Sequence, residues 1–280
     1  MAICYNLTGM IKVNKIKVSD LITASKLPSA DFVINPYIGC TNACKYCYAS
    51  FMKKFTFHPE PWGEFIDIKF CDKPLNTKKL IGKSVFLASV TDVYNDYEKE
   101  YGLTRKIIEQ LVGLDIELSI STKNALILRD IDLLKQMPRL TACLSINTTD
   151  ERFKNDMDKA SSIAERIAAL KTLHEHGIKT VLFMSPIFPE ITDWQNIISA
   201  TKDFVHEYWF ENLNLRGDYK STILNYIHKK HPTLVPLYNE IYNRGKQDYW
   251  HTLAKTIAEY CTEHSIRFKN YFFHDEIKKQ

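Results

Sequence analysis

The segment that decides the fold reads Gly39-Cys40-Thr41-Asn42-Ala43-Cys44-Lys45-Tyr46-Cys47-Tyr48. It carries three of the seven cysteines of the chain with the spacing C-x3-C-x2-C, on a loop that opens with a glycine. Three thiolates on one loop can hold three corners of a cubane iron–sulfur cluster, whereas four are usual in ferredoxin-type sites. The loop therefore predicts a cluster in which one iron is open to an external ligand.

The alternatives to a cluster are a zinc site and three unrelated core cysteines. A zinc site would need a distant histidine as its fourth ligand, and zinc sites usually begin with C-x2-C or C-x4-C pairs. Three unrelated core cysteines are not expected at this density. The other four cysteines are scattered, and Cys143, in the apolar run LTACLSI, is expected to be a small buried core residue. An odd number of cysteines does not suggest a disulfide framework.

On either side of this loop, short apolar runs alternate with helical patterns. Strands are predicted at 32–37, 84–90, 116–121, 140–147, 179–185 and 208–215. Helices are predicted at 43–54, 104–112, 125–136, 162–176 and 193–207. The alternation predicts a parallel α/β fold, and right-handed crossovers would close it into a partial (β/α)6 TIM-type barrel. A doubly wound sheet is the alternative.

Three regions are expected along the chain. Residues 1–30 are predicted to form a strand-rich N-terminal strap, and residues 31–217 the core barrel, with an insertion at 55–83. Residues 218–280 are predicted to form a C-terminal helical extension packed on the barrel, because no Pro-, Ser- or Gly-rich linker separates them from it. Within the extension, helices are predicted at 220–230, 234–244 and 249–264, and a strand at 266–272.

Composition excludes several classes of protein. The net charge of +4 over 280 residues is too small to make nucleic-acid binding a default, although it leaves a local basic patch open. No apolar run reaches the roughly 18 residues that a membrane span needs. The N-terminal residues show no signal-peptide core, so a cytoplasmic location is expected. There is no GxGxxG or GxxxxGK[ST] phosphate-binding loop among the nine glycines.

The cysteine loop, with aromatic Tyr46 before its last cysteine and a predicted strand in front of it, resembles the signature of the radical S-adenosylmethionine (SAM) superfamily. The resemblance implies that Cys40, Cys44 and Cys47 hold a [4Fe-4S] cluster whose open iron is chelated by the amino and carboxylate groups of SAM. Reduction would cleave SAM to methionine and a 5′-deoxyadenosyl radical that abstracts hydrogen from a substrate. It also implies an oxygen-sensitive enzyme that needs a low-potential electron donor, flavodoxin or ferredoxin.

Beyond this loop, the chain resembles the spore photoproduct lyase-like branch of that superfamily. Within the branch it is most similar to the group called radical SAM mobile pair protein B, whose members are encoded beside a second radical SAM protein. This implies that second protein as a partner. The matching segments are 35–40, 47–49, 88–94, 103–105, 122–123, 129–130, 145–150 and 185–189.

The resemblance also implies where SAM binds, since a parallel barrel presents its ligand groups at the carboxyl ends of its strands. Asp92, with Ser89 and Thr91 after the second strand, is expected to accept a hydrogen bond from the SAM ammonium, and Lys123 to contact the carboxylate or ribose. The other expected contacts are Ser145 and Asn147 to the ribose, Arg166 to the carboxylate, and Tyr46, Met184 and Ser185 around the adenine. A structural role is the alternative for these residues: a turn cap, a solvated surface or packing under the loop.

The chain departs from the branch at two places. Spore photoproduct lyases place a cysteine near the end of the second strand as a hydrogen donor, and this chain has Ser89 there. Because an O–H bond is much stronger than an S–H bond, repair of thymine dimers by the same route is not expected. Residues 151–161 lack the prolines common in the branch, so this loop is expected to meet a different substrate.

Nucleic acid, DNA or RNA, is the substrate that the resemblance favours. Lysines interleaved with aromatic residues that can stack on bases support the same substrate. The basic residues concerned are Lys53, Lys54, His58, Lys78, Lys79, Lys83, Lys229, Lys230 and His231. Lysine pairs that merely solvate the surface are the simpler interpretation of each pair. The alternatives are an enzyme that modifies a peptide or protein together with a second radical SAM protein, an electron-supplying subunit, and a zinc-stabilised nucleic-acid-binding module.

Overall fold

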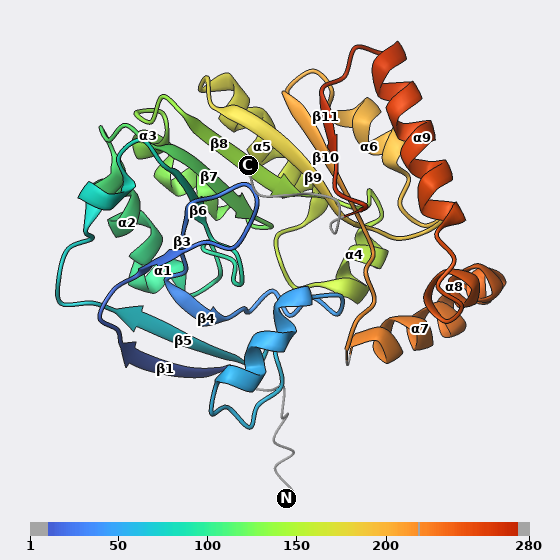
Figure 1. Ribbon diagram of the computed structural model, residues 1–280, viewed down its shortest axis with the longest axis horizontal. Coiled ribbons are helices and arrows are strands. Elements are labelled where there is room, and N and C mark those ends of the chain that lie inside the picture. Colours follow the sequence, from blue (N-terminus) through green and yellow to red (C-terminus); the bar gives the residue numbers. More distant parts are fainter. Residues whose placement is uncertain (1–10, 218, 274–280) are drawn as a thin grey trace, which may run out of the picture.

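The computed structural model describes residues 11–217 and 219–273. Its core is an eight-stranded sheet in the order β11-β10-β9-β8-β7-β6-β3-β2, in which β2 and β3 pair antiparallel and all other neighbours pair parallel. The strands are β2 (Ile22–Ala24), β3 (Phe32–Ile34), β6 (Ser84–Leu87), β7 (Glu117–Thr122), β8 (Leu140–Ser145), β9 (Lys179–Ile187), β10 (Glu207–Asn212) and β11 (Phe268–Asn270). The sheet is open, with β2 and β11 at its edges (Figure 1). The predicted partial barrel of six parallel units is confirmed, with β11 added beside it.

Helices follow most of the strands (Figure 1). The α-helices are α1 (Glu98–Tyr101), α2 (Leu103–Leu111), α3 (Ile131–Leu134), α4 (Glu151–Met157), α5 (Ile163–Glu175), α6 (Trp194–Thr201), α7 (Tyr219–Lys230), α8 (Val235–Tyr242) and α9 (Asp248–Glu263). The 3-10 helices are η1 (Tyr48–Phe55), η2 (Thr77–Leu80), η3 (Ala125–Asp130) and η4 (Pro232–Leu234). None of the helices in the described part of the chain is both long and apolar enough to cross a membrane.

Several predicted elements have different bounds in the structure. The predicted helix at 43–54 is wrong over its first part, because residues 43–47 form turns and only η1 is helical. The predicted strand at 32–37 divides into β3 and β4 (Tyr37–Gly39), since the Asn35 side chain accepts hydrogen bonds from the backbone of Ser89 and Val90. The helix predicted at 193–207 ends at Thr201, and α4 was not predicted.

A second, three-stranded sheet joins the strap and the insertion to the cysteine loop. Its order is β1 (Lys12–Lys17), β5 (Phe65–Phe70) and β4, with β1 parallel and β4 antiparallel to β5. Gly39, the last residue of β4, is paired with Ile66. The insertion is therefore attached directly to the strand that leads into Cys40. The boundaries of the strap, barrel and extension at 30 and 217 stay predictions, and residues 1–10, which include Cys4, lie outside the described part of the chain.

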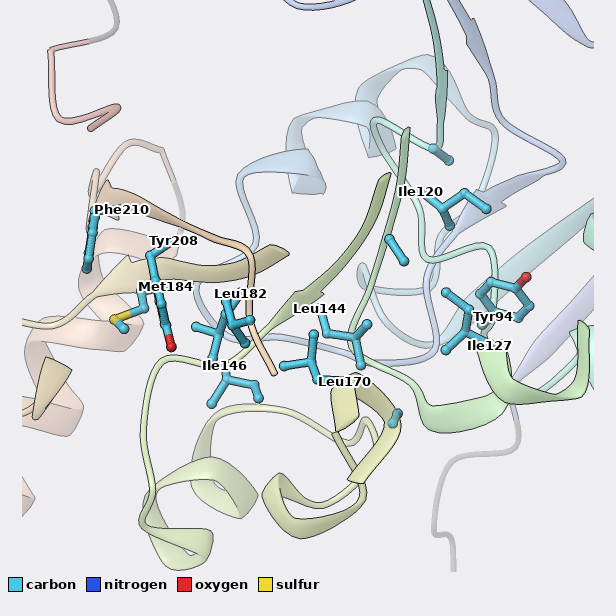
Figure 2. Packing of buried hydrophobic residues seen from close by; sticks show 14 of the residues in the cluster. Tyr94, Ile120, Ile127, Leu144, Ile146, Leu170, Leu182, Met184, Tyr208 and Phe210 are labelled. Atoms are coloured by element: carbon cyan, nitrogen blue, oxygen red, sulfur yellow. The ribbon is translucent and has the colours of Figure 1, made fainter. Parts of the chain in front are cut away.

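Side chains of the main sheet alternate between two faces. Figure 2 shows buried residues of one face: Leu144, Leu182, Met184, Tyr208 and Phe210 on the strands, Ile146 just after β8, and Leu170 of α5 near Leu144. On β8, Cys143 and Ser145 alternate with these residues and so face the barrel interior. Cys143 is buried, as expected, and so is Cys261 in α9, whereas Cys71 is partly exposed. The helices thus cover the outer face and leave the inner face to polar and aromatic residues.

Residues 103–105 and 129–130, two of the segments singled out in the sequence, meet in a largely buried ion network. Arg129 donates to the fully buried carboxylates of Glu98 and Asp130, at 2.6 and 2.7 Å. Arg105 adds a bond to Asp130 at 3.1 Å. Tyr37 of β4 donates its hydroxyl proton to Glu98. Because buried carboxylates must be paired, this network fixes β4, and with it the start of the cysteine loop, relative to α2 and η3.

Gly39 occupies a position that no other residue can fill without a shift. Its φ is +85°, in the left-handed region that favours glycine, and a Cβ there would lie 2.4 Å from the carbonyl oxygen of Phe65. Gly82 offers a matched comparison: its φ is +70°, but a Cβ there would meet nothing within 4 Å.

We expect Gly39→Ala to lower the free energy of unfolding by about 1–3 kcal/mol more than Gly82→Ala, because only the first adds a steric clash to the backbone strain that both share. Urea unfolding of the two variants and the parent measures the difference. An equal decrease in the free energy of unfolding for both variants would show that Phe65 of β5 does not restrict the space at Gly39.

Candidate active site

The cysteine loop follows β4 directly and gathers three thiols. Cys40 is buried, while Cys44 and Cys47 are partly buried. Burial raises the pKa of the Cys40 thiol to about 12, with contributions from Asp92 and Cys47. Burial also raises the pKa of Cys44, on which Cys47 and Cys40 both act. The thiols are therefore close enough to interact electrostatically and remain protonated until a metal displaces their protons.

Lys123 is a cation that acts on two of these thiols. It follows β7, is partly buried, and lowers the pKa of Cys44 and Cys47 against the larger effect of burial. Its Nζ lies 5.8 Å from the centre of the Tyr46 ring. The lysine predicted from the sequence thus points toward the cysteine loop, where a positive charge can meet an anionic ligand group.

The Asp92 carboxylate connects the cysteine loop to the strand ends. Its Oδ1 accepts from the Tyr94 backbone N–H at 3.0 Å and from Thr122 Oγ1 at 2.6 Å. Its Oδ2 accepts from Asn42 Nδ2 and from the Lys123 backbone N–H, both at 2.8 Å. An ionised carboxylate has about four acceptor positions, so these four bonds occupy all of them. The expected bond from the SAM ammonium to Asp92 has no acceptor position left in this arrangement.

Asn42, which the sequence did not single out, is the centre of a second set of contacts. Its Oδ1 accepts from Asn124 Nδ2 at 3.0 Å, and its backbone oxygen accepts from the N–H of Lys159 at 2.8 Å. The N–H of Lys45 donates to the carbonyl of Met157 at 2.9 Å. The end of α4 and the segment after it therefore hold the cysteine loop through backbone hydrogen bonds. Such bonds leave no recognisable pattern of side chains in the sequence.

Arg166 and Asp158 form a buried pair beneath Tyr46. Arg166 is fully buried and donates to Asp158 at 2.7 Å, to the Ser161 carbonyl at 2.8 Å and to the Ser145 carbonyl at 3.1 Å. The Tyr46 hydroxyl donates to Asp158 at 3.1 Å, and its ring meets Phe188 edge-on. The structure thus places Arg166 behind the loop, where it supports Tyr46, and not at an open ligand face.

The remaining strand-end residues have defined partners. Thr91 Oγ1 donates to the carbonyl of Gly39 at 2.6 Å. Asn147 Nδ2 donates to the Pro186 carbonyl at 3.0 Å. Ser185 Oγ donates to the Glu211 carboxylate. Met184 is buried on the helix side, so only its backbone remains available to a ligand.

The segment 151–161 borders a cavity of about 400 Å³ between α4 and α7. It is lined by Thr148, Asp150, Arg152, Phe153, Asp156, Glu190, Ile191, Tyr226, Lys230 and His231. Three of the basic residues noted in the sequence have defined surroundings in the structure. Lys230 and His231 line this cavity, whereas His58 is held between two carboxylates, 3.0 Å from Glu60 and 2.8 Å from Asp67.

Two buried hydrogen-bond donors in or beside the cysteine loop have no well-formed hydrogen bond. They are Thr41 Oγ1, between the first cysteines, and Trp62 Nε1, which acts on the Cys47 thiol. Buried donors are normally satisfied, and the sulfurs of an iron–sulfur cluster accept hydrogen bonds. The residues present therefore fit such a cluster. No three His, Cys, Asp or Glu side chains of residues 11–217 and 219–273 converge on a position for a single metal ion.

Sequence comparison places this loop within a known family. Residues 34–199 match the model of the radical SAM superfamily. An uncharacterized protein of Methanocaldococcus jannaschii is 42% identical over 212 residues, which cover 75% of this chain and 81% of that protein. The radical SAM Nalpha-GlyT isomerase of Pseudomonas phage M6 is 25% identical and covers 60% of this chain, but only 36% of the phage protein is matched.

Solved structures share the fold. Spore photoproduct lyase complexed with dinucleoside spore photoproduct superposes with a TM-score of 0.56 at 19% identity, covering 79% of this chain and 66% of that one. Streptococcus suis SuiB bound to S-adenosylmethionine gives a TM-score of 0.53 at 14% identity, covering 85% of this chain and 49% of that one. The family model spans more than half of the chain, around the cysteine loop and the parallel strands described above. The chain therefore belongs to the radical SAM superfamily.

Proposed function

We propose that this radical SAM enzyme holds a [4Fe-4S] cluster on Cys40, Cys44 and Cys47, binds SAM across the strand ends, and acts on a nucleic acid. The observation that carries the proposal is the set of three interacting thiols beside two buried donors without good acceptors. When bound, the reduced cluster supplies the electron that splits SAM into methionine and a 5′-deoxyadenosyl radical, which abstracts hydrogen from the substrate. The electron comes from a low-potential donor such as flavodoxin or ferredoxin.

The residues around the loop divide into two groups in this proposal. Lys123, Ser145, Asn147, Ser185 and the backbone of Met184 contact SAM, with Tyr46 and Ser89 bordering its site. Thr91, Asp92 and Arg166 instead position the cysteine loop through their bonds to Gly39, Asn42 and Asp158. For Asp92 this follows from hydrogen-bond capacity, because a carboxylate whose four acceptor positions are filled cannot also bind an ammonium group.

An exposed aromatic and basic surface supports a nucleic-acid substrate. Four of the most exposed large apolar side chains lie in or next to η1, directly after the last cysteine: Tyr48, Phe51, Phe55 and Phe57, at 58, 49, 66 and 106% exposure. Lys54 lies 4.9 Å from the centre of the Phe55 ring, and Lys53 is its neighbour in sequence. Exposed rings interleaved with lysines suit single-stranded nucleic acid, whose bases stack and whose phosphates attract cations. We call these six residues the η1 surface.

The barrel interior offers a further aromatic group. Phe183, Trp209 and Tyr271 lie on neighbouring strands or just after them and pack edge-on, with ring centres 5.8–6.2 Å apart. Lys269 lies 5.2 Å from the centre of the Trp209 ring. Aromatic faces of this kind can stack on a planar base. The dinucleoside in the solved spore photoproduct lyase complex supports the same substrate class.

Replacing Cys40, Cys44 or Cys47 by alanine is expected to abolish SAM cleavage and to remove the electron paramagnetic resonance signal of a reduced [4Fe-4S] cluster that changes on adding SAM. Each thiolate is one of only three protein ligands, so its loss leaves the cluster without a full set. Cys71→Ala, at a partly exposed cysteine outside the loop, is the control and should keep four irons per chain. A Cys44→Ala protein with a normal SAM-sensitive signal would refute the ligand assignment.

Lys123→Met is expected to weaken SAM binding by roughly tenfold, because a charge-assisted hydrogen bond is lost. Titration of the reduced cluster signal with SAM measures the affinity. Lys135→Met, at an exposed lysine after α3, removes the same charge at a distance and should leave the affinity unchanged. An unaltered SAM affinity in Lys123→Met would show that Lys123 does not contact SAM.

Phe55→Ala is expected to weaken binding of single-stranded DNA or RNA by about tenfold, since base–aromatic stacking is worth about 1–3 kcal/mol per base. Binding should also weaken with rising salt, as phosphate contacts require. Ile81→Ala, at another exposed apolar residue, is the control. Two results together would contradict a nucleic-acid substrate and favour a peptide or protein. The first is no binding to nucleic acid at low salt. The second is formation of 5′-deoxyadenosine only when a peptide or a second radical SAM protein is added.

A further inference from the structure

The insertion at 55–83 brings Trp62 against the cysteine loop. Gly63, with φ +99°, lies so close to this loop that a Cβ there would be 2.7 Å from the Cβ of Ala43. The indole N–H of Trp62 is buried and has no hydrogen-bond partner among the described residues, and it lies close enough to Cys47 to act on that thiol. A glycine at 63 is therefore what permits the indole to approach the last cysteine.

A stack of side chains holds this indole in place. The Trp62 ring meets Phe65 edge-on, with ring centres 5.7 Å apart and planes at 87°. Phe65 is fully buried and stacks on His58, with centres 3.9 Å apart and planes at 13°. His58 is in turn fixed by Asp67 and Glu60 through its two ring nitrogens. Each member of the stack comes from the insertion, so the insertion builds a rigid support for one N–H group.

An N–H group held next to a cluster sulfur changes the energy of the cluster. The reduced cluster carries one more negative charge than the oxidised cluster, and a hydrogen bond to its sulfur stabilises the more negative state more strongly. The reduction potential is therefore higher with the bond than without it. Apolar burial acts in the opposite direction, because a low-dielectric environment disfavours added charge.

We propose that Trp62 donates an N–H···S hydrogen bond to Cys47 or an adjacent cluster sulfur and raises the reduction potential of the cluster. The inference rests on the cluster assignment of the proposed function. Trp62 is a positioning residue in this role, because it acts through the cluster ligand and does not contact SAM or the substrate. The insertion thus has a function in electron transfer besides its part in the small sheet.

The test is a potentiometric titration of the reconstituted full chain, monitored by electron paramagnetic resonance, in the parent, Trp62→Phe and Trp194→Phe. Trp194→Phe removes an indole from α6, where it packs on Tyr260. We expect Trp62→Phe alone to lower the midpoint potential, by up to tenfold in the equilibrium constant for reduction, which is about 59 mV for a one-electron couple. An unchanged potential in Trp62→Phe with four irons per chain would overturn the inference and leave the cluster assignment intact.

A second measurement decides the matter if Trp62→Phe fails to fold or to load iron. The parent protein, labelled with 15N in its tryptophan indoles, is reduced and examined by electron–nuclear double resonance. Trp194 and Trp250 lie on the outer helices α6 and α9, and repeating the measurement with Trp209→Phe removes the interior indole of β10, so a weak 15N coupling that persists identifies Trp62. A reduced cluster without such coupling overturns the inference, whereas a parent protein that takes up no cluster overturns the proposed function itself.

Discussion

The Asp92 carboxylate is the point on which the arrangement of the site depends. Its four hydrogen bonds join a turn after β6, the end of β7, and Asn42 in the middle of the cysteine loop. A buried carboxylate with every acceptor position filled is stable only if all its donors stay in place. The loop, the strand ends and Lys123 are therefore fixed together. The surrounding contacts, from Arg166 through Asp158 to Tyr46, fix the other end of the same loop.

The insertion and the strap act on this loop from the other side. β5 pairs with β4, so a segment that interrupts the α/β alternation supports the entry to Cys40. The ion network of Glu98, Arg129 and Asp130 then attaches β4 to the barrel through Tyr37. These groups lie outside the cysteine signature, yet they decide where its thiols point. Three sets of contacts thus hold a loop that has little regular structure of its own: the bonds to Asp92, the contacts from Arg166 to Tyr46, and the pairing of β4 with β5.

The sequence predicted the barrel well, because strands buried on one face and helices with apolar periodicity leave local patterns. It predicted the cysteine loop from spacing alone. It failed where tertiary contacts override local preference: residues 43–47 look helical but form turns, and Asn35 breaks a strand to bind the backbone of Ser89. Asn42, Asp158 and Trp62 were not singled out, because their partners lie far away in sequence. Sequence also cannot show that the acceptor positions of Asp92 are filled or that Arg166 is fully buried.

The open sheet has a consequence for how the protein meets other chains. Its edge strands, β2 and β11, do not pair with each other, and both are only three residues long. Short edges resist pairing with strands from other chains. The sheet therefore stays open without offering a long strand on which a second molecule could extend it.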